Sequence, residues 1–224
     1  EPRVEGGRMY GRGAGDMKAG AGANVFALEA LRRIGLQPAA TVYLQSVVEE
    51  ESTGNGAMQT FLRGYTADAV LIPEPEDNKL VRTCGGVLWF EVEVRGIPVH
   101  VREMGEGANA IDAAIRVIGA LREIEAKWNA EKHQHPGYET EPKPINMNIG
   151  IIEGGRATNI VPDVVTLQGE ARSRVGAKLD EQTRQMVAAL EERAAAHGAT
   201  AEVTVRLSYE AYALTESDGV VRLV

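Results

Sequence analysis

The segment VLWFEVEVR, from Val87 to Arg95, predicts the fold of the longer half of the chain. Its side chains alternate in character along its length. The four even-numbered positions are wholly apolar: Leu88, Phe90, Val92 and Val94. The odd-numbered positions include two glutamates. An antiparallel sheet with one covered face and one open face produces this alternation, so we predict a strand with its apolar side covered.

The residues after this strand predict the other elements of the same half. An amphipathic helix is expected at 108–125, because apolar side chains recur there at helical spacing. Strands are expected at 145–152 and 164–171, then a helix at 180–196 and a last strand at 201–207. The order β-α-β-β-α-β is that of the split, ferredoxin-like unit. Between the first helix and the second strand, 129–144 is a polar, proline-containing segment, where His133 and His135 are expected to be solvated.

The first part of the chain has a different pattern. A helix is expected at 23–34 and a short one at 58–62, and the apolar runs 41–48 and 68–72 are typical of strands buried on both faces of a parallel sheet. Alternating helices and strands predict a doubly wound α/β sheet. We therefore expect an α/β domain at 1–84, the ferredoxin-like unit inserted at 85–207, and a return to the first domain at 208–224.

Composition narrows the range of partners. The net charge is −8, which argues against nucleic acid or an anionic membrane as a partner, because both would be repelled. Cys84 is the single cysteine, so no disulfide forms within the chain and a reducing, cytoplasmic location is expected. No run approaches the roughly 20 apolar residues of a membrane span.

Acidic residues stand at the points where the first domain should form a site. Asp16 precedes the first helix, Glu49-Glu50-Glu51 follow the first apolar run, and Glu74 follows the second. Sites in open α/β sheets form at the carboxyl ends of the strands, so these acids should converge. Converging carboxylates repel unless a cation or protons neutralise them, and a divalent metal would do so.

Each acid also has a simpler interpretation. Asp16 could cap a helix, the three glutamates could form a solvated loop, and Glu74 could belong to a rigid turn between prolines. The nearby glycines do not predict a nucleotide loop. Gly11 and Gly13 could begin a G-x-G-x-x-G motif, but Asp16 occupies the place of its third glycine. No G-K-[ST] is present either.

Several motifs in this order resemble the acetylornithine deacetylase, succinyl-diaminopimelate desuccinylase and carboxypeptidase G family. The motifs are YGRGAGDMKAG (10–20), EESTGNG (50–56), Glu74-Pro75, GIPVH (96–100), GANAI (107–111), EGG (153–155), NIVP (159–162) and GEAR (169–172). The resemblance covers nearly the whole chain. It implies a zinc-dependent hydrolase that cleaves an amide bond of an N-acyl amino acid or small peptide, and a homodimer formed through the inserted domain.

The resemblance also implies roles for individual residues. Asp16 would bridge two zinc ions, for which Co²⁺ or Mn²⁺ could substitute, and would be followed by a cis peptide at Asp16-Met17. Glu51 and Glu74 would each ligate one of the ions, and Glu50 would be the general base.

Residues of the inserted domain would complete the site. His100 would reach the partner's site and stabilise the oxyanion, while Asn159 and Arg172 would contact substrate. Alternatives from the residues themselves stay open: His100 could cap a strand end, Asn159 could form a turn, and Arg172 could pair with Glu170.

The resemblance also implies ligands that this sequence lacks. The family supplies a histidine ligand before the bridging aspartate and another near the end of its catalytic domain, and no histidine here stands in either motif. Zinc prefers nitrogen ligands beside oxygen, so carboxylates alone should bind it weakly. We therefore expect a central fragment, weakly active or inactive by itself. The alternative function is a non-catalytic dimerisation module that retains unused acidic motifs.

Overall fold

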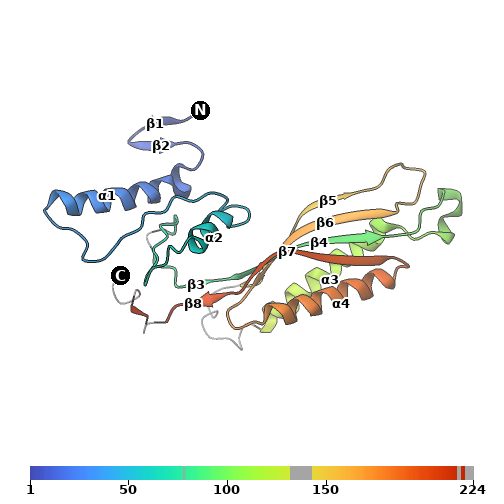
Figure 1. Ribbon diagram of the computed structural model, residues 1–224. Helices are drawn as coiled ribbons and strands as arrows, with labels where there is room; N and C mark the ends of the chain where they lie inside the picture. The colour runs from blue at the N-terminus through green and yellow to red at the C-terminus, as the bar shows by residue number, and fades with distance from the viewer. Residues whose placement is uncertain (78, 132–142, 216–217, 220–224) are drawn as a thin grey trace. The chain divides into compact units, whose positions relative to one another are not determined.

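The computed structural model describes residues 1–77, 79–131, 143–215 and 218–219. Contacts divide the chain into two compact units (Figure 1). Unit 1 comprises Glu1–Val81 with Glu216–Val224, and unit 2 comprises Arg82–Thr215. Within the described ranges, no helix combines the length and the apolar character that crossing a membrane requires.

Unit 2 is built on a four-stranded antiparallel sheet. Its strands are β4 (Gly86–Arg95), β5 (Met147–Gly154), β6 (Val164–Ser173) and β7 (Thr200–Tyr209), in the order β5-β6-β4-β7. The helices α3 (Ala110–Ala130) and α4 (Leu179–Ala195) lie on one side of this sheet (Figure 1). The predicted β-α-β-β-α-β unit is therefore confirmed, and its strand order is that of a ferredoxin-like fold.

The apolar face of β4 is buried in the core of unit 2, as the alternation of its side chains predicts. Its four even-numbered side chains are each at most 3% exposed and pack with apolar residues of both helices; the helix residues include Ala113, Ala114, Val117, Leu121, Met186 and Leu190. The other face of the sheet carries polar pairs such as Gln168 Nε2 donating to Glu91 Oε2 over 2.8 Å. Helix α3 continues to Ala130, so the predicted loop at 129–144 begins later than expected. His133 and His135 lie outside the described residues.

The start of α3 is fixed by a side-chain cap and a close backbone approach. Asn109 Oδ1 accepts hydrogen bonds from the backbone N–H groups of Ile111 and Asp112, at 2.9 and 3.2 Å. These bonds satisfy donors that the first turn of a helix leaves unpaired. A Cβ on Gly96 would lie 2.0 Å from the carbonyl oxygen of Ala108, so only glycine permits β4 to end against this segment. A short pair, β3 (Thr83–Cys84) with β8 (Tyr212–Ala213), completes unit 2.

Unit 1 contains the hairpin β1 (Arg3–Glu5) and β2 (Arg8–Tyr10), the helical turn η1 (Ala14–Ala19), and the helices α1 (Gly20–Arg33) and α2 (Asn55–Leu62). Both predicted helices are confirmed. The hairpin was not predicted, because the stretch before Met9 reads only as polar and turn-like. Gly6 and Gly7 supply the two positive φ angles, 56° and 74°, that a two-residue hairpin turn needs.

The predicted strands at 41–48 and 68–72 are wrong. Neither range belongs to a strand, and apolar side chains in both are exposed, for example Leu44 at 52% and Val70 at 72%. A strand is stable only where its N–H and C=O groups pair with a neighbouring backbone. In the described part of unit 1, the one paired ladder is β1 with β2, so these apolar runs have no strand beside them.

Candidate active site

Asp16 lies in η1, directly before α1, and the Asp16-Met17 peptide bond is cis, as the resemblance implies. The interpretation of Asp16 as a helix cap is wrong. Gly13 and Ala19 hold the cap positions of η1 and α1, and neither helix start has a side-chain cap bond. A Cβ on Gly20 would lie 2.2 Å from the carbonyl oxygen of Pro73. Glycine at this position therefore lets the segment of Asp16 lie against the segment that carries Glu74.

The paired glutamates stand on a tight turn formed by the residue before them. Glu49 has a positive φ of 63°, and its carbonyl oxygen accepts hydrogen bonds from three successive N–H groups, of Ser52, Thr53 and Gly54, at 3.3, 3.1 and 2.9 Å. The Thr53 hydroxyl also donates to the Glu49 carboxylate over 2.5 Å. This turn presents Glu50 and Glu51 just before α2. The sequence singled out Glu49 only as one of three acids after the apolar run, and its role in forming the turn has no local sequence signal.

The pKa of Glu74 shows that the acids gather. The pKa of Glu74 is raised above its ordinary value, and partial burial is the largest cause. The charges of Asp16 and Glu50, a hydrogen bond with Asp16, and the charge of Glu51 raise it further, in that order. Carboxylates raise one another's pKa only when they are close. The structure thus brings together four of the five acids that the sequence singled out, which we call the acidic cluster: Asp16, Glu50, Glu51 and Glu74.

The acidic cluster does not make a complete zinc site. Across the ranges that the structure describes, no three histidine, cysteine or acidic residues are arranged so that they could hold a metal ion. The donors of the cluster are all carboxylate oxygens, whereas zinc sites in proteins commonly include nitrogen or sulfur. The cluster therefore fits part of a ligand set.

In unit 2, His100 and Asn159 lie on neighbouring segments. His100 forms an isolated β-bridge with Ile160, and the Val101 N–H donates to the Asn159 carbonyl oxygen over 3.2 Å. His100 also caps a short 3₁₀ turn, with its Nδ1 accepting from the Arg102 N–H over 3.3 Å. A neutral imidazole that accepts at Nδ1 carries its proton on Nε2. His100 therefore presents an N–H donor at Nε2, which is the group that an oxyanion requires.

Arg172 has a partner in the structure. It lies on β6 and forms an ion pair with Glu170, whose carboxylate also accepts a hydrogen bond from Trp89 Nε1 over 2.9 Å. The alternative interpretation of Arg172, a pair with Glu170, is thus observed. A substrate carboxylate would have to compete with Glu170 for the guanidinium.

The chain thus combines a unit that carries an acidic cluster with a ferredoxin-like unit inserted along the sequence. Comparison with known proteins shows the family to which it belongs. Residues 84–198 match the family described as peptidase dimerisation domain. Curated relatives include the N-formyl-4-amino-5-aminomethyl-2-methylpyrimidine deformylase of Bacillus subtilis, 28% identical over 83% of this chain and 46% of the relative. A probable carboxypeptidase of Aspergillus clavatus is 34% identical over 81% of this chain and 40% of the relative.

Solved structures agree over the full length of the chain. The aminopeptidase PepT of Bacillus cereus has a TM-score of 0.73 and 26% identity, covering 100% of this chain and 57% of that one. A tripeptidase of Staphylococcus aureus has a TM-score of 0.71 at the same identity and coverage. The chain belongs to the acetylornithine deacetylase, succinyl-diaminopimelate desuccinylase and carboxypeptidase G family. It spans about half the length of the curated relatives that it matches.

Proposed function

We propose that the protein containing this chain is a metal-dependent hydrolase that cleaves an amide bond of an N-acyl amino acid or a small peptide. The observation that carries the proposal is the gathering of three other carboxylates around Glu74, in a chain whose family consists of such hydrolases. Repelling carboxylates are a feature that selection for stability alone would remove, and a divalent cation reverses the repulsion.

Three acids of the cluster are proposed as metal ligands. Asp16 would lie between two zinc ions, with Glu51 on one and Glu74 on the other, and Co²⁺ or Mn²⁺ could substitute for zinc. The described residues do not supply the further ligands that such a site needs. When bound, a metal ion of this kind supplies electrostatic activation of a water molecule, whose pKa falls to about 7.

The remaining site residues are proposed to handle protons and charge. Glu50 would accept the proton of the attacking water at its carboxylate oxygen, for which it must be ionised at the working pH. His100 of one subunit would donate its Nε2–H to the developing oxyanion in the other subunit's site. Asn159 and Arg172 would bind the substrate. Arg172 would then exchange Glu170 for the substrate carboxylate, to which its planar fork can donate two hydrogen bonds.

A homodimer through unit 2 belongs to the same proposal. Support comes from the match to a dimerisation domain and from exposed isoleucines on β5 and α3. A reducing, cytoplasmic location is proposed from the single cysteine. The second candidate function is a dimerisation module without catalysis. The incomplete ligand set and the engaged Arg172 favour it.

The test uses the protein expressed from its complete gene. It is assayed against N-formyl, N-acetyl and N-succinyl amino acids and against di- and tripeptides, first as purified, then after chelation, then with zinc restored. The hydrolase proposal predicts turnover of at least one substrate that chelation abolishes and zinc restores. Turnover that survives complete metal removal would refute it. A folded dimer that turns over no substrate in the panel would favour the dimerisation module.

A further inference from the structure

The end of helix α3 and the start of helix α4 border a hollow of about 330 Å³ in unit 2, which we call the α3–α4 hollow. Trp128 and Glu131 line it from the end of α3. Arg174 and Lys178 line it from the segment between β6 and α4, and Gln182 lines it from α4 itself. Small-molecule sites in proteins have volumes of roughly 300–1,000 Å³, so the α3–α4 hollow has room for a small ligand.

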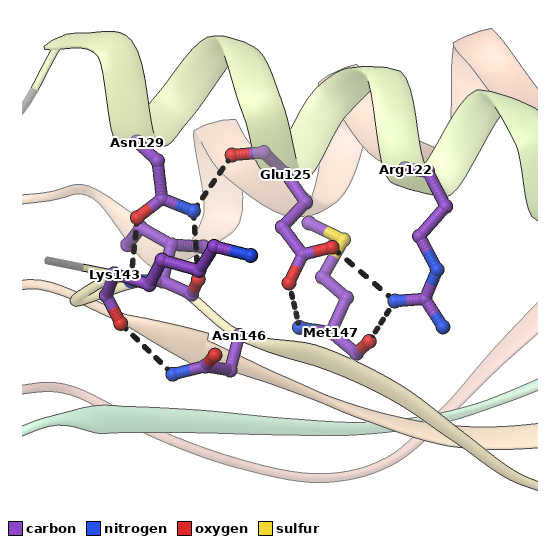
Figure 2. Close-up of polar contacts among 7 residues, drawn as sticks. Arg122, Glu125, Asn129, Lys143, Asn146 and Met147 are labelled. Carbon is purple, nitrogen blue, oxygen red and sulfur yellow. Dashed lines mark hydrogen bonds and ion pairs between the residues drawn. The ribbon is translucent and has the colours of Figure 1, made fainter.

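The α3 wall of the hollow is fixed to the sheet by Asn129, which lies between the two lining residues of α3. Asn129 donates from Nδ2 to the Ile145 carbonyl oxygen over 2.8 Å and accepts at Oδ1 from the Ile145 N–H over 3.1 Å (Figure 2). The Trp128 ring packs in the apolar core of unit 2. The positions of Trp128 and Glu131 are therefore set by contacts that do not involve the hollow.

Trp128 has a hydrogen-bond donor that the described residues do not use. The residue is only 7% exposed, yet its Nε1–H donates to no acceptor in the part of the chain that the structure describes. A buried indole N–H usually finds a partner. In the same part of the chain, no fully buried side-chain nitrogen or oxygen lacks one, so Nε1 is not sealed in the core. Because Trp128 lines the α3–α4 hollow, this donor is available to a ligand there.

The α4 wall carries two cations without an acidic partner. Among the described residues, neither Arg174 nor Lys178 forms an ion pair, and Arg174 donates only to the Val175 carbonyl oxygen, over 3.5 Å. Arg184 and Arg193, farther along α4, both pair with glutamates. The start of a helix adds a partial positive charge, and the planar fork of arginine suits a carboxylate. This wall therefore favours a carboxylate group.

The α3 wall carries the opposite charge. Glu131 is the C-cap residue of α3, at the end of the helix that carries a partial negative charge. Its carboxylate has no hydrogen-bond or ion-pair partner within the described ranges. The other carboxylate that lines the hollow, that of Glu181, is already held by Arg184 and Gln185. Glu131 is therefore the group that can accept from an ammonium ligand.

We propose that the α3–α4 hollow binds a free α-amino acid, with its carboxylate at Arg174, Lys178 and the Trp128 N–H and its ammonium group at Glu131. The two charges of the zwitterion match the two walls. A simple anion would leave Glu131 unpaired, and a simple amine would leave the two cations unpaired. The inference does not depend on the proposed hydrolase function, because none of these residues belongs to the candidate active site.

Trp128 fluorescence in the full chain tests the proposal. Trp89→Phe leaves Trp128 as the single tryptophan of the chain, so the emission reports on the α3–α4 hollow. The protein amino acids other than tryptophan and tyrosine are titrated without added metal, and calorimetry measures each affinity independently. At least one should bind saturably and change the emission. The same molecule without its amino group, or without its carboxyl group, should bind at least about tenfold more weakly, because each loses a charged hydrogen bond.

Substitutions on both walls should have the same effect. Arg174→Ala, Lys178→Ala and Glu131→Gln should each weaken binding about tenfold or more. Lys178 is exposed, so its variant removes a charge with little effect on packing. Arg193→Ala and Glu123→Gln are the matched controls, because they break an ion pair between the same two helices outside the hollow, and both should bind as tightly as the parent. Urea unfolding checks that each variant is folded.

Several results would overturn the proposal. One is the absence of both a fluorescence change and a binding heat for every amino acid. Another is equally tight binding of the analogue without an amino group, which would make the hollow a simple anion site. A third is binding that Arg172→Ala abolishes and Arg174→Ala leaves intact, which would place the ligand at the candidate substrate residue instead.

Discussion

Replacing Asn129 with alanine should destabilise unit 2 strongly for a single substitution. Asn129 is the one side chain in the described residues that satisfies both backbone groups of Ile145, a residue that is 0% exposed, and it also donates to the Glu125 carbonyl oxygen over 2.9 Å. A buried polar group left without a partner costs about 1–3 kcal/mol. With two such groups at Ile145, and some access of water at the sheet edge, we expect the free energy of unfolding to fall by about 2–4 kcal/mol.

The assay is urea unfolding followed by tryptophan fluorescence. Both tryptophans, Trp89 and Trp128, lie in unit 2, so the signal reports on this unit. With a typical slope of about 2 kcal/mol per molar urea, the midpoint for Asn129→Ala should fall by roughly 1–2 M.

Two further substitutions serve as controls. Asn129→Asp keeps the acceptor for the Ile145 N–H but loses both donated bonds and turns a charge toward carbonyl oxygens, so it should be at least as harmful as alanine. Lys127→Ala, on the exposed side of the same turn of α3, should unfold within about 0.5 kcal/mol of wild type. A midpoint for Asn129→Ala indistinguishable from that of Lys127→Ala would mean that water replaces the side chain without loss, and that the Asn129 bonds do not stabilise unit 2.

Three further outcomes follow from individual contacts. A hydrogen bond from Arg193 on α4, and then its charge, lower the pKa of Glu123. The stability that this pair adds should therefore be present above the ordinary glutamate pKa and lost as the pH falls through the lowered value. Wild type and Glu123→Gln should differ in urea midpoint at pH 7, and the difference should shrink as the pH falls into the acid range. Gly169→Ala should lower the Tm, because its Cβ would meet a backbone oxygen at 2.4 Å, whereas Gly119→Ala, with open space in α3, should raise the Tm through helix propensity, by up to about 1 kcal/mol of stability. In a zinc titration calorimetry experiment on the chain, Glu74→Gln should abolish the weak binding heat and Glu76→Gln should leave it intact; equal heats for the two variants would remove Glu74 from the ligand set.

Sequence periodicity was sufficient to predict the main strands and helices of unit 2, because it depends only on the residues within each element. Each side chain of β4 points to the face that its position dictates, and the helix stripes follow the same logic. The same reasoning failed for the ranges 41–48 and 68–72. Apolar content shows that a segment is suited to a sheet, but a strand also needs a neighbour, and the sequence of the segment does not contain that neighbour.

The sequence predicted which residues belong to the candidate site better than it predicted how those residues are arranged. The motifs identified Asp16, Glu50 and Glu74, and the structure gathers them. The tight turn at Glu49 was not foreseen, because it depends on a positive φ that glutamate rarely adopts. The engagement of Arg172 with Glu170 was one of two readings that the sequence left open, and it depends on side-chain geometry that spacing alone does not determine.

The most direct test of the proposed chemistry is the kcat of Glu50→Gln beside that of Glu49→Gln, in the protein expressed from its complete gene and loaded with zinc. Glutamine at 49 still accepts the Thr53 hydroxyl bond, so this variant preserves the turn while removing a neighbouring charge. We expect Glu50→Gln to lose about 100-fold or more of kcat with its zinc content and dimer unchanged, and Glu49→Gln to stay close to wild type. A Glu50→Gln enzyme that turns over substrate at the wild-type rate would show that Glu50 is not the general base.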